Sequence, residues 1–227
     1  MYSIRELFRR CLGGACPLCD WPAPAGDLCS HCESTVRCDK SLSQTSGGLA
    51  VIAATAYARP GDQLMRALKE GGQLHHAGLY ARLLWCAMRA TEPPQPSLAA
   101  LVPIPADLRA ARRRGFNPAC EIAVELSRLS RLPVRRLWLS RTRSAESQKS
   151  LDRAARKKSV HALYQSPQSL PRVWVGLVDD VMTTGSTLEA GASALLKAGV
   201  QGVIGLVGAS TPYPGGSHSV ELDPHQQ

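Results

Sequence analysis

The sequence predicts a parallel α/β sheet with helices on both faces, and the spacing of its apolar segments is the first observation that indicates this. Short apolar segments recur at roughly 30-residue intervals with helical patterns between them, as expected for a doubly wound sheet. The second observation is segment 173–178, which is rich in β-branched residues and lacks helical periodicity, so it fits a strand buried on both faces. A helical pattern follows at 188–199 and ends at a glycine, which completes a strand-to-helix unit.

The other elements are predicted by the same patterns. Residues 1–10 fit a short amphipathic helix, and the Ser-, Thr- and Gly-rich segment 39–48 fits a linker. His75 and His76 lie at the start of a helix, where exposed polar residues are common, and we assign them no ligand role. Strands are expected at 49–57, 98–104, 134–139, 160–164 and 200–209, and helices at 64–69, 74–90 and 119–132.

Net charge limits the kinds of partner. The chain carries 27 basic and 18 acidic residues, a formal net charge of +9, which favours an anionic partner such as a phosphate, a nucleotide or a nucleic acid. Four arginines fall within 109–114, and 128–158 is also rich in Arg and Lys, although such runs also form solvated helix faces. No apolar run reaches membrane-spanning length and the N-terminus does not resemble a signal peptide, so we expect a cytoplasmic protein without a membrane span.

Cysteine spacing predicts a metal site near the N-terminus. Six of the eight cysteines fall within 11–38, and without an export signal this clustering favours metal binding over disulfides. Two C-x-x-C pairs, separated by nine residues, suit a structural tetrahedral Zn²⁺ because each turn directs two sulfurs at one point. The predicted ligands are Cys16, Cys19, Cys29 and Cys32, with Cys11, Cys38 and His31 as alternative ligands.

The segment after the strand at 173–178 has the chemistry of a phosphate site. Two adjacent carboxylates, Asp179 and Asp180, stand where the strand is expected to end, and a loop of small hydroxyl residues with a glycine follows. Backbone N–H groups of such a loop and of the next helical turn bind anions, and the hydroxyls add donors. The carboxylates would repel a phosphate, so vicinal sugar hydroxyls or a divalent metal are their expected partners. The alternative is a strand whose carboxylates only cap the next helix.

The 13 residues 175–187 resemble the motif by which type I phosphoribosyltransferases bind 5-phosphoribosyl-1-diphosphate (PRPP). In that family the acidic pair takes the ribose hydroxyls and the loop takes the 5′-phosphate. The resemblance implies a type I phosphoribosyltransferase-like sheet and Mg²⁺ bound together with PRPP. It implies PRPP contacts from Asp179, Asp180, Val181, Met182, Thr183, Thr184, Gly185, Ser186 and Thr187.

Several short motifs follow one another along nearly the whole chain. The C-x-x-C pairs come first, followed by Val-Pro-Ile-Pro at 102–105, Arg-Gly-Phe-Asn at 114–117, Arg-Thr-Arg at 141–143 and Gln148. This order is similar to that of the ComF family, whose members are linked to competence and DNA utilisation. The chain departs from the family at Ser159, which stands where the Asn of an Arg-x-x-Asn-Val sequence is common.

Resemblance to related transferases also implies a diphosphate site. Segment 103–107, with Pro105 and Ala106, would meet the diphosphate through its backbone amides, and a flap carrying Arg141 and Arg143 would close over it. Arginine and Mg²⁺ can neutralise the charge that develops on a leaving pyrophosphate, so these two arginines and the acidic pair 179–180 are the expected catalytic groups. A solvated loop is the alternative for the arginines.

These observations predict three parts and leave three functions open. We expect a zinc-ribbon module at 1–46, a phosphoribosyltransferase-like domain at 47–213 and a flexible tail at 214–227. The leading hypothesis is a PRPP-binding, Mg²⁺-dependent protein of the phosphoribosyltransferase type, with an unidentified acceptor and a link by resemblance to DNA uptake or utilisation. One alternative is a non-catalytic protein that binds single-stranded DNA and senses PRPP, and the other is a scaffold. Competence or helicase-type proteins are further expected partners.

Overall fold

The computed structural model describes residues 14–37, 42–92, 95–142, 163–167 and 169–211. Within these ranges the central sheet has five strands in the order β3-β4-β9-β8-β5. The strands β4, β9, β8 and β5 are parallel, and β3 is an antiparallel edge strand paired with β4. Their bounds are β3 Leu42–Gln44, β4 Ala50–Ala56, β5 Leu98–Pro103, β8 Trp174–Met182 and β9 Gly202–Ser210.

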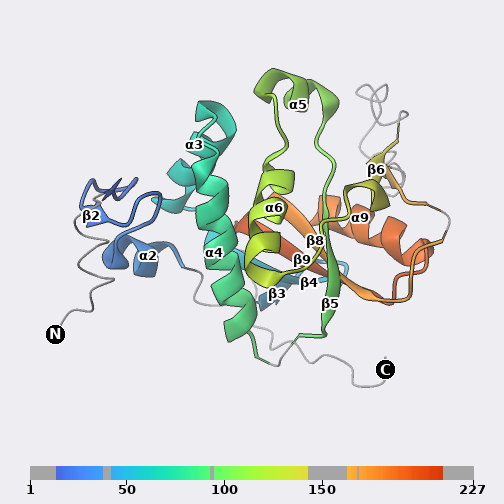
Figure 1. The fold of residues 1–227 in the computed structure, drawn as a ribbon. Coiled ribbons are helices and arrows are strands. Elements are labelled where there is room, and N and C mark those ends of the chain that lie inside the picture. The colour runs from blue at the N-terminus through green and yellow to red at the C-terminus, as the bar shows by residue number, and fades with distance from the viewer. Residues whose placement is uncertain (1–13, 38–41, 93–94, 143–162, 168, 212–227) are drawn as a thin grey trace.

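Helices cover both faces of this sheet (Figure 1). Along β4, Ile52 packs into the apolar cluster beneath α3, α4 and α6, whereas Val51 packs into the cluster beneath α9. Neighbouring strand residues point to opposite faces, so the two clusters are the two sides of one sheet. The predicted parallel α/β sheet flanked by helices is therefore confirmed. The helix bounds are α3 Gly61–Gly71, α4 His75–Ala90, α6 Pro118–Ser130 and α9 Ser186–Lys197.

The N-terminal part packs against α4. It contains a two-stranded ribbon, β1 (Gly14–Ala15) with β2 (Pro22–Ala23), and the helix α2 (Ser30–Val36). Arg82 of α4 joins it through both sides of its guanidinium: Nη2 lies 2.6 Å from Asp27 Oδ1, and Nη1 lies 3.3 Å from Glu33 Oε2. Buried residues of this part belong to the same apolar cluster as α3 and α4, so the contact is apolar as well as ionic.

Three predicted elements differ from the structure. The strand expected at 134–139 is wrong: Val134 makes a single bridge to Leu101, and the 3-10 helix η1 (Arg136–Trp138) follows. Three consecutive residues there, 135–137, are exposed, so no buried strand forms. Segment 39–48 is not only a linker, because it contains β3. The strand expected to end at Val178 continues as β8 through the acidic pair to Met182.

His76 is buried, with 1 % of its surface exposed, because its ring packs at the start of α4 beside Gln73. A two-stranded ribbon, β6 (Ser140–Arg141) with β7 (Tyr164–Gln165), lies at one end of the strand predicted at 160–164. The predictions for the helix 1–10, Cys11, Cys38, Arg143, Gln148, residues 156–160 and the tail 214–227 lie outside the described residues.

Candidate functional site

The acidic pair lies near the carboxyl end of β8, between the neighbouring strands β9 and β5. Asp179 is 8 % exposed, and its Oδ1 accepts a hydrogen bond from the backbone N–H of Asp180 at 2.8 Å. Asp180 Oδ1 accepts from Val181 N–H at 2.7 Å, and Asp180 Oδ2 lies 3.0 Å from Lys69 Nζ of α3. Lys69 was missed in the sequence, because the pattern of α3 does not show which strand its last turn approaches.

Burial sets the electrostatics of this pair. Burial raises the pKa of Asp179 well above its usual value, and the adjacent charge of Asp180 raises it further. The N–H of Asp180 and the more distant ammonium of Lys69 oppose the shift without cancelling it. The site therefore favours a bound group that supplies hydrogen-bond donors or positive charge to Asp179.

The turn after β8 presents hydroxyl groups at the start of α9. Thr183, Thr184 and Ser186 are exposed, and the Oγ atoms of Thr184 and Ser186 lie 3.1 Å apart. Gly185 occupies the N-cap position with φ +80°, and a Cβ there would lie 2.5 Å from Thr45 Cγ2. Only glycine fits this position without displacing the β3–β4 loop. Gly185 offers the helix start no capping side chain, and Thr184 Oγ1 accepts a long hydrogen bond of 3.5 Å from Ser186 N–H, so the first turn keeps N–H groups for an anion.

The β3–β4 loop supports this turn from the other side. Glu189, in the first turn of α9, accepts hydrogen bonds from Gly47 N–H at 2.6 Å and from Ser46 Oγ at 3.4 Å. The sequence does not predict this role of the loop, because its Ser-, Thr- and Gly-rich residues have the composition of a linker. Its link to α9 spans more than a hundred residues of sequence, and no local pattern predicts it.

The segment predicted to meet a diphosphate lies beside the end of β8. Ile104 N–H donates to Val178 O at 2.8 Å, and Asn117 Nδ2 donates to Ile104 O at 2.9 Å. These bonds hold the half-buried Pro105 and Ala106 next to the acidic strand. Asp107 then caps α5 (Leu108–Arg114), accepting from the N–H groups of residues 109 and 110.

Arg141 is the described member of the predicted flap pair, and it faces the same segment. Its Nη2 lies 3.8 Å from Asp107 Oδ2. Its strand partner Tyr164 is buried, which raises the pKa of Tyr164 to about 12; the charge of Arg141 lowers this pKa, while that of Asp179 raises it. The carboxyl ends of β5 and β8 therefore gather the acidic pair, the Thr/Gly turn, Pro105, Ala106 and Arg141, at the edge where parallel sheets bind ligands.

The four predicted zinc ligands come together in the N-terminal part. The Sγ atoms of Cys16, Cys19, Cys29 and Cys32 all lie within 4.8 Å of one another, and those of Cys19 and Cys29 are 3.7 Å apart. A tetrahedron with Zn–S bonds of about 2.3 Å has edges of about 3.8 Å, so the cluster fits a Zn²⁺ ion. His31, the described alternative ligand, is exposed and does not belong to this cluster.

Local hydrogen bonds and crowding shape the acidity of these thiols. Burial acts to raise the pKa of Cys16, but backbone hydrogen bonds from Cys29, Leu18 and Cys19 outweigh it and lower this pKa to about 7. Burial and the neighbouring sulfurs raise the pKa of Cys32 far above its usual value. Four thiolates cannot share this space without a cation, whereas a bound metal would stabilise them together.

The fold and the cysteine cluster define the class: a mixed α/β protein with a mostly parallel sheet and an N-terminal cysteine cluster that can hold a metal ion such as zinc. Among the described helices, none has both the length and the apolar character needed to span a bilayer. No protein-family model matches the chain.

Relatives identify the family. The chain is 31 % identical over 198 residues to competence protein F of Haemophilus influenzae, covering 83 % of this chain and 86 % of the relative. It is 28 % identical over 215 residues to the DNA utilization protein YhgH of Escherichia coli, covering 84 % and 94 %. It is 27 % identical over 207 residues to competence protein ComFC of Bacillus subtilis, covering 87 % and 78 %. The chain belongs to the ComF family.

Proposed function

We propose that this chain binds PRPP together with Mg²⁺ at the carboxyl ends of β5 and β8, in a type I phosphoribosyltransferase-like domain. The observation that carries the proposal is the combination, at one sheet edge, of a buried acidic pair with an exposed hydroxyl turn that opens a 12-residue helix. Asp179 and Asp180 would accept hydrogen bonds from the ribose hydroxyls. The turn 183–187 would donate to the 5′-phosphate through backbone N–H groups and hydroxyls.

The diphosphate end of the ligand would lie toward β5. Pro105 and Ala106 would line it through their backbone, and Arg141, with Arg143 beyond the described residues, would supply positive charge. Mg²⁺ would neutralise diphosphate oxygens and so favour departure of pyrophosphate. The close approach of Gly185 to Thr45 supports the fit, because the turn has a backbone shape that a side chain would destroy. Transfer of the phosphoribosyl group to an acceptor is the activity that this site would serve.

Calorimetric titration of PRPP with Mg²⁺ tests the proposal directly. We expect the wild-type protein to bind one PRPP, and the double variant Asp179→Asn/Asp180→Asn to bind about a hundredfold more weakly, because two charged hydrogen-bond acceptors are lost. A double variant of exposed acids, Glu70→Gln/Glu92→Gln, is the matched control and should bind as the wild type does. Absence of binding by folded wild-type protein would overturn the proposal. If PRPP binds, pyrophosphate release in an acceptor screen would show whether the protein also turns PRPP over.

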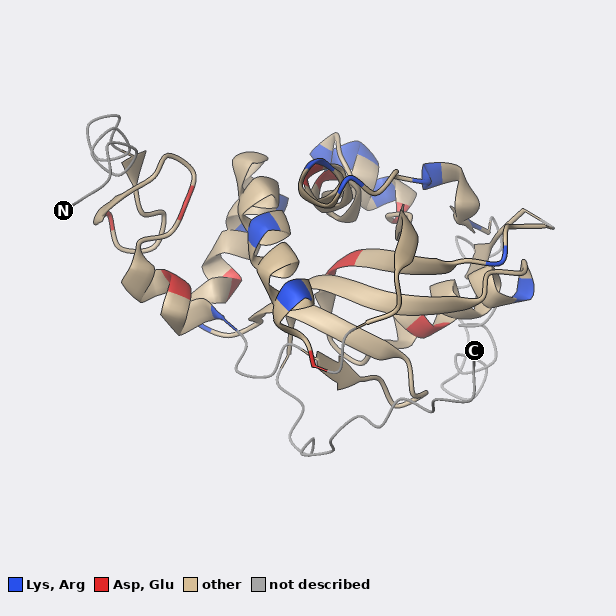
Figure 2. Cartoon of the chain, turned by 60° about the horizontal axis from the view of Figure 1, so that its bottom comes forward, with Lys and Arg blue, Asp and Glu red and all other residues tan. Residues whose placement is uncertain are grey.

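A second candidate function is binding of single-stranded DNA, and the basic helix α5 favours it. Arg109, Arg112 and Arg113 are exposed on this helix, which follows directly on segment 103–107 (Figure 2). We propose a role in competence or DNA utilisation in the cytoplasm, in line with the names of the relatives, with DNA and competence or helicase-type proteins as partners. The zinc-bearing part, proposed here to be a zinc ribbon formed by residues 1–46, would contribute to that surface.

A further inference from the structure

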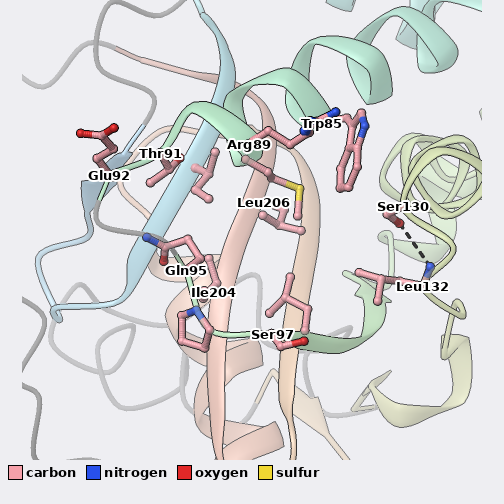
Figure 3. A pocket seen from close by; sticks show the side chains of 14 residues that line it. Trp85, Arg89, Thr91, Glu92, Gln95, Ser97, Ser130, Leu132, Ile204 and Leu206 are labelled. Carbon is pink, nitrogen blue, oxygen red and sulfur yellow. Dashed lines mark hydrogen bonds between the residues drawn. The ribbon is translucent and has the colours of Figure 1, made fainter.

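A cavity lies at the opposite edge of the sheet from the acidic pair. It is lined by the start of β5, the C-terminal half of α4, the end of α6 and early residues of β4 and β9, and its volume is about 450 Å³ (Figure 3). Ile204 in its floor is paired with Gly176 of β8, four residues before Asp180. That spacing separates the cavity from the acidic pair by roughly 13 Å along the strand.

The floor of the cavity is apolar and continuous. It is formed by aliphatic side chains of the sheet, among them Ile52, Leu98, Ile204 and Leu206. Gly176 makes this floor flat: a Cβ there would lie 2.6 Å from Leu206 Cδ1 and 3.2 Å from Leu98 Cδ1. Because Gly176 has no side chain, those two leucines close over the strand. An open apolar cavity of this size suits a drug-sized ligand that removes the floor from water.

One wall adds an aromatic ring and a cation. Trp85 and Arg89 lie one turn apart on α4, with Arg89 Cζ 5.9 Å from the centre of the Trp85 ring. Both belong to the lining of the cavity (Figure 3), as does Met88 of the same helix. Glu92, the other charged residue of the lining, has its carboxylate turned away from the cavity (Figure 3). The charge presented at the mouth is therefore positive.

We propose that this cavity, hereafter the amino-edge pocket, binds a small molecule that combines a planar aromatic ring with an anionic group. The ring would lie on the leucine and isoleucine floor against Trp85 and Met88, and the anion would meet Arg89 at the mouth. The hydroxyl of Ser97 and the amide of Gln95, both in the lining, would set its orientation. The pocket is separate from the proposed PRPP site and does not depend on it.

The probe for the test is 8-anilino-1-naphthalenesulfonate, an aromatic sulfonate whose fluorescence rises in apolar surroundings. We expect saturable binding to one site on the full chain, unchanged by PRPP with Mg²⁺. Arg89→Gln should weaken binding about tenfold, because a charged hydrogen bond is lost. Ser97→Trp, at an exposed rim position, should abolish it by filling the mouth. Circular dichroism checks that each variant is folded.

Arg112→Gln is the control, because it removes an exposed arginine at the other edge of the sheet. It should leave probe binding unchanged. The proposal is overturned if the probe does not bind the wild type, if both pocket variants bind it as the wild type does, if Arg112→Gln weakens binding as much as Arg89→Gln, or if PRPP displaces the probe.

Discussion

At the scale of single residues, Asp179 is held in surroundings that oppose its charge. Burial and the neighbouring Asp180 raise its pKa, so the ionised side chain destabilises the folded state at neutral pH. Asp179→Asn removes the charge and keeps the Oδ1 that accepts from the N–H of Asp180. We expect its free energy of unfolding to rise by about 1 kcal/mol near neutral pH, as is common where a binding site is built at the expense of stability.

The pH dependence of this gain has a definite sign. A raised pKa in the folded state contributes stability that is fully present below the unfolded pKa of about 3.9 and is lost as pH rises through the folded pKa. The advantage of Asp179→Asn should therefore be small near pH 4 and larger above it. Urea unfolding across this range measures it, with the exposed Glu70→Gln as control. A less stable Asn variant at neutral pH would contradict the argument.

His76 should make the protein sensitive to mild acid. Burial, and then the charge of His75, lower the pKa of His76 to about 4. A lowered pKa in the folded state contributes stability that is present above the unfolded pKa of about 6.5 and is lost as pH falls toward the folded pKa. The free energy of unfolding should therefore fall by about 2 kcal/mol at pH 5. His76→Leu should remove most of this loss, whereas His75→Gln, at an exposed position, should keep it. Thermal unfolding from pH 7 to pH 5 tests this; equal pH dependence in His76→Leu would contradict it.

At the scale of elements, the cysteine cluster joins the β1–β2 ribbon to α2. This part of the chain has few buried residues of its own, so a bound metal would supply much of its stability. We expect about one zinc per chain by elemental analysis, and Cys16→Ser/Cys19→Ser should remove it. Cys86→Ser/Cys120→Ser, in α4 and α6, should retain it. Because the metal would supply much of this stability, zinc loss should also expose 14–37 to proteolysis, although Arg82 of α4 pairs with Asp27 and Glu33. Full metal retention in the first variant would contradict the assignment.

Local patterns predicted those elements whose own residues determine their structure. The apolar stripe of α4 and the β-branched run of β8 both appear where they were expected. The apolar residues of segment 134–139 favour a strand, but Leu137 is exposed and the edge of the sheet offers Val134 a single bridge. β3 was missed because its residues have little strand character and its order comes from pairing with β4.

Local sequence patterns also predict only those parts of the candidate site that lie within one short segment. The acidic pair, the Thr/Gly turn and the four cysteines were found because each lies in a short contiguous motif. Lys69 and the β3–β4 loop were not, since their contacts with Asp180 and Glu189 depend on how distant elements pack. His76 shows the converse: a polar residue at a helix start is usually exposed, but the turn between α3 and α4 buries this one.

At the scale of the whole molecule, the two edges of the sheet have different chemistry. The carboxyl edge gathers carboxylates, hydroxyls and the arginines of α5, whereas the amino-edge pocket is apolar with one cation at its mouth. The arginines of α5 adjoin the segment proposed to meet a diphosphate, so a long anionic polymer on α5 would lie close to the proposed PRPP site. Such a placement would allow PRPP to influence DNA binding without direct contact between the two sites.

The net charge of +9 alone gives weak attraction to any nucleic acid, so a specific DNA-binding surface is shown by the position of its arginines as well as by their charge. If α5 contacts phosphates, Arg112→Gln/Arg113→Gln should lower the affinity for single-stranded DNA and reduce the slope of log affinity against log salt by about 1.4, because each lost phosphate contact removes about 0.7. Arg37→Gln/Arg66→Gln removes the same charge from the C-cap of α2 and from α3, where Arg37 pairs with Glu33 and Arg66 pairs with Asp62. That control should leave the slope unchanged. Equal slopes for the two double variants, measured by fluorescence anisotropy, would show that DNA binding does not involve α5.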